Sequence, residues 1–168
     1  MAYGTESVAP VNKIVGPGNI YVAEAKRQVS GFVGIDMFAG PSEIVVISDQ
    51  NSDPKIISAD LIAQSEHDKS AQSILITTDQ TLAEAVEDEV PSQLESLPRK
   101  EIASASWESN GKIIVVRDLK EAFDISNKLA PEHLELAIDN ARDFLKYIVN
   151  AGAVFLGRNT PEALGDYV

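Results

Sequence analysis

The sequence has 168 residues, a formal net charge of −12, 44% hydrophobic and 24% charged residues, and no cysteine. This composition is typical of a globular protein with one well-buried core or two small ones, and the negative charge argues against a nucleic-acid partner. The lack of cysteine excludes disulfides and Cys-ligated zinc, and no membrane span or signal peptide is recognisable, so we expect a cytoplasmic protein without membrane contact.

The first part of the chain is predicted to contain a short strand at residues 13–15, a glycine-rich turn at Gly16–Asn19 and a helix from Ile20. A glycine-rich turn before a helix allows the phosphate or ribose of a ligand to approach the backbone. The full dinucleotide-binding fingerprint GxGxxG is absent. A tight turn in which Asn19 caps the helix is therefore the favoured interpretation from spacing alone.

A second turn, Ala39–Glu43, leads into a predicted strand at residues 43–48. Ser42 in this turn is a candidate for hydrogen bonding to a substrate. Most serines in such turns only satisfy the local backbone. The pattern is not a nucleophile elbow, because GxSxG is missing.

The rest of the chain alternates apolar strands with helical patterns. Further strands are predicted at 73–78, 112–116, 134–138 and 153–156. Helices are expected after Asp53, after Asp79 or Thr81, after Asp118 and over 141–149, with a broken helix over 91–109. Nearly continuous Ile/Val/Leu strands that alternate with helices predict an α/β fold with a mainly parallel sheet flanked by helices.

Only two histidines occur, and each follows a glutamate. Gln64 and His67 are three positions apart, so on a helix their side chains share a face and could converge on zinc or manganese. Two donors do not make a metal site, however. A histidine at a helix C-terminus that interacts with the helix dipole is the favoured interpretation when this pair is taken alone.

The second pair, Glu132-His133, stands between a helix end with Pro131 and a predicted strand. A carboxylate beside an imidazole can divide the roles of general base and general acid. Adjacent strand residues point to opposite faces, so both can serve one site only where the backbone is irregular. Functional and structural interpretations of this pair remain equally favoured at this point.

Taken together, five blocks of sequence strongly resemble the histidinol dehydrogenase family, in the family's order and spacing and over essentially the whole chain. The blocks are Lys13–Val22, Gly34–Glu43, Ala59–Asp68, Ala130–Glu135 and Thr160–Tyr167. The resemblance implies oxidation of L-histidinol through L-histidinal to L-histidine with two NAD⁺. It also implies a three-layer, incomplete Rossmann-like domain and a homodimer.

The resemblance also assigns site residues. It implies zinc ligation by Gln64, His67 and Asp166, which with Ser42 and His133 would contact the substrate, and an NAD contact at Asn19. Glu132 would activate the water that hydrates the aldehyde, and His133 would carry protons in both oxidations.

The family's members extend beyond both ends of this sequence. We therefore expect residues 1–168 to be one excised domain of a longer enzyme, inactive or nearly so alone. Two other hypotheses are a stand-alone α/β binding or interaction module with structural Glu-His pairs, and a metal-dependent hydrolase that uses Glu132 as base without NAD.

Overall fold

The computed structural model describes residues 1–16, 18–36, 38 and 40–166. Pro17, Ala39 and Tyr167, which belong to the sequence blocks above, lie outside the described residues. The chain divides into two compact units, Met1–Pro41 and Ser42–Val168. No helix in the described part is long and apolar enough to cross a membrane.

The first unit holds one helix and a two-stranded parallel sheet. Strand β1 (Lys13–Ile14) pairs with β2 (Gly34–Ile35), and α1 (Ile20–Val29) lies between them in the chain. The helix begins where the sequence predicts it, because Asn19 caps it. Strand β2 is not predicted, since a two-residue strand that begins with glycine has no periodic pattern.

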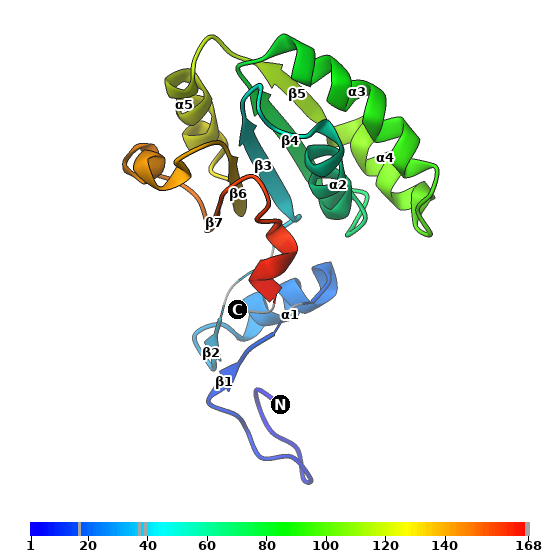
Figure 1. Ribbon diagram of the computed structural model, residues 1–168. Coiled ribbons are helices and arrows are strands. Elements are labelled where there is room, and N and C mark those ends of the chain that lie inside the picture. The colour runs from blue at the N-terminus through cyan, green and yellow to red at the C-terminus, as the bar shows by residue number, and fades with distance from the viewer. Residues whose placement is uncertain (17, 37, 39, 167–168) are drawn as a thin grey trace. The chain divides into compact units, whose positions relative to one another are not determined.

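The second unit is built on a five-stranded sheet in which every neighbouring pair is parallel (Figure 1). The strand order is β5-β4-β3-β6-β7. The strands are β3 (Glu43–Ser48), β4 (Gln72–Thr77), β5 (Lys112–Val115), β6 (His133–Ala137) and β7 (Ala153–Leu156). This arrangement confirms the predicted α/β class with a mainly parallel sheet.

The helices of this unit are α2 (Pro54–Ser65), α3 (Gln80–Leu94), α4 (Lys100–Asn110) and α5 (Leu119–Leu129). All except α4 start at the predicted caps, and α4 begins without a side-chain cap bond. Asp53, Asp79 and Asp118 each accept a backbone N–H with the side chain at the start of α2, α3 and α5. The predicted broken helix at 91–109 corresponds to the end of α3 and most of α4.

Two segments are 3₁₀ helices, η1 (Ala141–Tyr147) and η2 (Glu162–Asp166). The prediction of an α-helix over 141–149 is therefore wrong in type. Asn140, which precedes η1, adopts a left-handed conformation with φ 52° and makes no side-chain cap bond. Without a cap, this short segment takes the tighter 3₁₀ winding.

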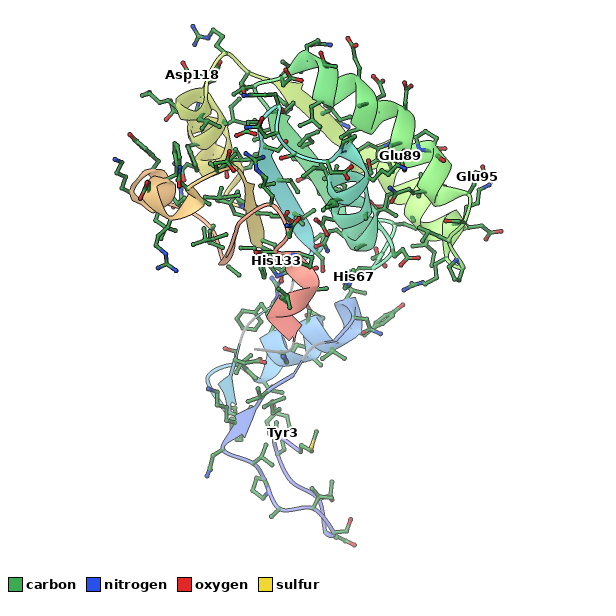
Figure 2. All side chains as sticks on the ribbon, viewed as in Figure 1. Tyr3, His67, Glu89, Glu95, Asp118 and His133 are labelled. Atoms are coloured by element: carbon green, nitrogen blue, oxygen red, sulfur yellow. The ribbon has the colours of Figure 1, made fainter. Side chains whose placement is uncertain are left out.

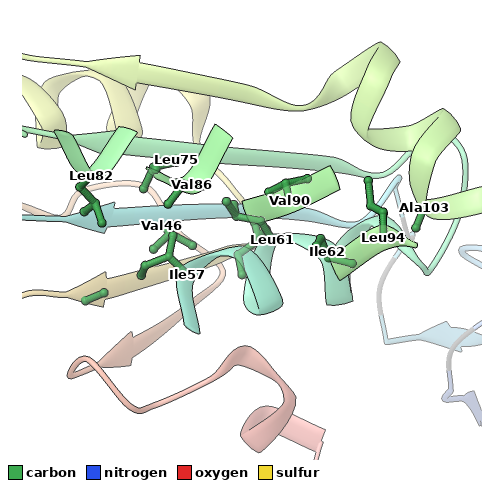
Figure 3. Packing of buried hydrophobic residues seen from close by; sticks show 12 residues of the cluster. Val46, Ile57, Leu61, Ile62, Leu75, Leu82, Val86, Val90, Leu94 and Ala103 are labelled. Atoms are coloured by element: carbon green, nitrogen blue, oxygen red, sulfur yellow. The ribbon is translucent and has the colours of Figure 1, made fainter. Parts of the chain in front are cut away.

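The sheet is covered on both faces, and alternate residues of each strand serve the two cores. On one face, Ile44 and Val46 of β3 pack with residues of α2, α3 and α4 (Figure 3). On the other face, Val45 and Ile47 pack with Phe123 of α5 and with η1. The unbroken apolar run of β3 reflects this burial on both faces.

Candidate functional site

The site residues predicted in the second unit gather at the edge of the sheet where the strands begin. Ser42 directly precedes β3, and His133 is the first residue of β6. Helix α2 returns antiparallel to the strands, so its last turn brings Gln64 to this amino edge, with His67 just beyond the helix end. Figure 2 shows His67 and His133 at the same end of the sheet, away from Asp118, which follows β5.

Open α/β sheets commonly bind ligands at the opposite, carboxyl edge, where the strand order reverses. Here that reversal lies between β3 and β6. At their carboxyl ends, Arg158 forms ion pairs with Asp49 at 2.8 Å and Asp139 at 3.0 Å and donates to the Ala137 carbonyl at 2.9 Å. Hydrogen bonds to Asp139 and Asp49 raise the pKa of Arg158. The carboxyl edge is thus joined by a structural ion-pair network, and the candidate site lies at the amino edge.

His133 faces the layer that contains α2. Ala137, four positions on along β6 and therefore on the same strand face, belongs to the core shared with α2. The Nδ1 atom of His133 lies 3.3 Å from Glu162 Oε1 and 3.5 Å from Gln64 Oε1. The side chains of His133 and Glu162 are 21% and 14% exposed. With Nδ1 directed at these two oxygens, Nε2 is the nitrogen left for a substrate.

Glu162 is a functional candidate that the sequence does not single out. In the sequence it reads as an acidic residue at a helix opening, after Pro161. In the structure η2 brings its carboxylate to the start of β6, a contact between residues 29 positions apart that no local spacing predicts. A carboxylate at Nδ1 favours the imidazole tautomer with its proton on that nitrogen, which leaves Nε2 free to accept a proton.

Two further carboxyl groups, one buried and one half-buried, lie on the same side of the sheet. Glu135 shares its strand face with His133 and is 0% exposed, and Asp60 lies one turn before Gln64 on α2. Within the described residues, both oxygens of Glu135 and the Oδ2 atom of Asp60 lack a hydrogen bond of regular geometry. The two groups act on each other through charge and a looser polar contact.

This environment raises the pKa of both carboxyl groups. Burial, followed by the nearby Asp60 carboxyl and the charge of Glu162, raises the pKa of Glu135 to about 9. Burial also raises the pKa of Asp60. Glu135 is therefore a neutral acid at neutral pH. The sequence offers only a weak signal for this pair, namely a glutamate inside an apolar strand.

The backbone around Glu132 is set by two unusual positions. Ala130 caps α5 in the left-handed conformation, with φ 53°, and turns the chain into Pro131. Gly152 lies so close to β6 that a Cβ added there would be 2.7 Å from the Glu132 carbonyl oxygen. Because β6 begins at His133, Glu132 stands before the first strand residue. The strict alternation of strand side chains therefore does not fix its direction.

A metal ion would need more donors than the described side chains bring together. Gln64 is 1% exposed with its Nε2 unpartnered, whereas His67 is exposed and lies past the end of α2. The helical-face argument for this pair is thus only approximate. Within the described residues no three His, Asp or Glu side chains form a group that could hold a metal. Asp166 ends η2, and its side chain is outside the described part.

Asn19 lies in the first unit, where its cap role is confirmed. Its Oδ1 accepts from the N–H groups of Tyr21 and Val22 at 3.1 and 3.2 Å. The oxygen is therefore occupied, and the amide Nδ2 is the atom with which this side chain could contact a ligand.

These features define a Rossmann-like α/β protein with a candidate acid–base histidine at the amino edge of its sheet. The family model for histidinol dehydrogenase matches residues 1–168, and the chain belongs to this family. It is 61% identical to a histidinol dehydrogenase of Gluconobacter oxydans and 58% identical to one of Rhizobium meliloti, over its whole length. It spans 39% of the length of each of these relatives.

Solved structures agree with the sequence comparison. A crystal structure of histidinol dehydrogenase from Elizabethkingia anophelis matches the whole chain with a TM-score of 0.95 and 44% identity, over 39% of that chain. A second match is a structure of an NADP-dependent glyceraldehyde-3-phosphate dehydrogenase from Bacillus halodurans complexed with NADP. The match covers 83% of this chain and 43% of the dehydrogenase chain, with a TM-score of 0.53. At 13% identity this second likeness concerns the fold alone.

Proposed function

We propose that the chain is part of an L-histidinol dehydrogenase, which oxidises L-histidinol through L-histidinal to L-histidine and reduces two NAD⁺. The observation that carries the proposal is the His133 imidazole, whose Nδ1 lies 3.3 Å from Glu162, in a chain of this family. An alcohol oxidation releases a proton as the hydride leaves, so the site must contain a base near the reacting carbon.

In the first oxidation, the hydroxyl proton of histidinol passes to Nε2 of His133 while the hydride leaves the carbon. Glu162 holds the imidazole through Nδ1 and stabilises the imidazolium that forms. The aldehyde that results must gain an oxygen before a second hydride can leave.

Glu132 removes a proton from the water that adds to the aldehyde carbon, which forms the hydrate. In the second oxidation, a hydroxyl proton of the hydrate passes to His133 and a second hydride leaves, giving the carboxylic acid. Ser42, half-buried just before β3, would hydrogen-bond the substrate.

The cofactors in this proposal are NAD, which accepts the hydrides, and zinc, which orients the imidazole and amine of the substrate. Gln64, His67 and Asp166 would hold zinc. The Gln64 oxygen supports this assignment, because its one described contact is the long 3.5 Å approach to His133. Asn19 would contact NAD. We further propose a longer polypeptide that forms a cytoplasmic homodimer, on the basis of the family relationship.

The proposal is tested with Glu132→Gln and His133→Asn in the complete gene product, by following NADH formation from histidinol and from histidinal. General acid–base groups contribute about 10²- to 10⁴-fold, so His133→Asn should slow both oxidations by this order. Glu132→Gln should slow the oxidation of histidinal more than that of histidinol, and both variants should retain zinc.

Glu66→Gln is the matched control, because Glu66 precedes His67 as Glu132 precedes His133. Its rates should stay within about twofold of the wild type. His67→Asn should instead lower the zinc content measured by metal analysis. Retained activity in both His133→Asn and Glu132→Gln would refute the role assignment, and turnover without NAD would favour a hydrolase.

A further inference from the structure

Lys26 is a buried cation in the 41-residue first unit of the chain. It lies on α1 with 6% of its surface exposed. Its Nζ donates to the carbonyl oxygen of Gly16 at 2.5 Å and to Oδ1 of Asp36 at 2.7 Å. A lysine is rarely buried to this extent without a specific set of acceptors.

Asp36 contacts both Lys26 and Gly16. Its Oδ2 accepts the backbone N–H of Gly16 at 2.8 Å, while Oδ1 accepts from Lys26. Both backbone polar groups of Gly16 are thus bound by one ion pair, and Gly16 itself has φ 133°, a conformation that favours glycine. We call Lys26 and Asp36 the turn clamp.

The start of α1, the helix that carries Lys26, is also well defined. Asn19 is bound to the first turn of α1 through Oδ1. A Cβ added at Gly18 would lie 2.4 Å from Cβ of Val22, so the backbone there approaches the helix as only glycine allows. The clamp therefore ties Gly16 to the helix whose first turn holds Asn19.

Stability alone gives little reason for this arrangement. Burying two charges costs desolvation energy, and well-packed apolar residues often stabilise as much as a buried ion pair does. An apolar pair could not bind both the N–H and the carbonyl of Gly16, however. The feature that this pair supplies in particular is a fixed position of Gly16 relative to α1, which carries Lys26.

We propose that Lys26 and Asp36 are positioning residues for the dinucleotide cofactor, which hold Gly16 against α1 so that Gly16 and Asn19 are arranged to bind NAD. This inference rests on the proposed NAD contact at Asn19. The clamp contacts Gly16 directly, and it would act on the cofactor through Gly16 and Asn19.

The test is the double variant Lys26→Met/Asp36→Asn in the complete gene product, which removes both charges together. The KM for NAD should rise about tenfold, because small displacements of a binding group weaken binding strongly. The kcat at saturating NAD and the KM for histidinol should stay within about twofold of the wild type. Arg27→Met/Glu24→Gln is the matched control, since this ion pair lies on α1 with side chains 72% and 56% exposed.

Asn19→Asp separates the two proposals, because aspartate keeps the helix cap but removes the Nδ2 donor. An unchanged KM for NAD in Asn19→Asp would refute the cofactor contact and the inference with it. A raised KM in Asn19→Asp with an unchanged KM in the double variant would refute the inference alone. A double variant in which kcat, both KM values and Tm all deteriorate together would also overturn it, as this is the result of a purely structural role.

Discussion

Among individual residues, Glu135 carries the most unusual chemistry. It is fully buried beside His133 on β6, and burial with two acidic neighbours, Asp60 and Glu162, raises its pKa to about 9. A carboxyl group that stays protonated at neutral pH adds no negative charge to a site that already contains Glu162 and Asp60. The side chain therefore places a polar group near His133 without a second buried anion.

The raised pKa predicts how stability depends on pH. The folded state keeps the Glu135 proton up to about pH 9, whereas the unfolded chain releases it near the ordinary value of 4.5. Between these values the folded state binds more protons, so the free energy of unfolding falls as the pH rises. The pKa of Asp60 is raised to about 6, so this group acts in the same direction over a narrower pH range. Chemical denaturation from about pH 5 to about pH 8 should show this decline.

Glu135→Gln should weaken the decline, because glutamine keeps the size of the side chain but has no proton to lose. Glu87→Gln on the exposed face of α3 is the control, and its curve should run parallel to that of the wild type. Parallel curves for wild type and Glu135→Gln would contradict the assignment of a protonated, buried Glu135.

Among the elements, the entry into β6 depends on close backbone packing. Gly152 donates its N–H to the Pro131 carbonyl at 3.0 Å, and the next residue, Ala153, donates to the Glu132 carbonyl at 2.8 Å. These bonds tie the start of β7 to the segment that carries Glu132 and His133. The position of the proposed catalytic pair is thus a property of two strands.

Gly152→Ala should disturb this entry. The new methyl group would lie 2.7 Å from the Glu132 carbonyl oxygen, so the backbone must move. Overpacking of this kind typically destabilises by about 1–3 kcal/mol. Hydrogen exchange of the β6 amides should accelerate, and in the complete gene product histidinal oxidation should slow. Gly40→Ala is the control, since a Cβ there meets nothing within 4 Å; faster exchange in it, or unchanged exchange in Gly152→Ala, would contradict the prediction.

The same elements show what the sequence can and cannot predict. Strand β3 and the caps at Asp53 and Asp118 follow from local patterns, which is why their positions were predictable. The contact of Glu162 with His133 depends on how η2 folds back onto β6, and the burial of Glu135 depends on α2. Such contacts between distant segments leave no periodic trace in a single sequence.

For the site residues, the family resemblance selects positions and the structure adds their surroundings. The fold brings Nδ1 of His133 to 3.5 Å from Oε1 of Gln64. The sequence could not indicate this contact, because 69 positions separate the two residues. The fold also places the pair at the amino edge of the sheet, although an α/β pattern alone favours the carboxyl edge. The functional roles of all these site residues stay predictions, those of His133 and Gln64 included.

At the scale of the whole molecule, the described residues bring together few of the groups that our proposal requires. It spans 39% of the length of its relatives, and the described side chains include no group of three His, Asp or Glu that could bind a metal. Zinc is usually four-coordinate, and our proposal supplies three donors from this chain, namely Gln64, His67 and Asp166. A substrate held by so few contacts is poorly oriented for hydride transfer.

We therefore predict that a polypeptide of residues 1–168 alone forms NADH from histidinol at least about a hundredfold more slowly than the complete gene product, because orientation of the reactants supplies much of the rate. Its affinity for zinc should also be lower, since the three proposed donors alone leave the ion partly hydrated. Absorbance of NADH and equilibrium dialysis with zinc measure the two quantities. His67→Asn in the 168-residue chain should reduce what zinc binding remains, whereas Glu66→Gln should not. Turnover by the short chain within about tenfold of the complete product would show that these residues suffice to orient cofactor and substrate.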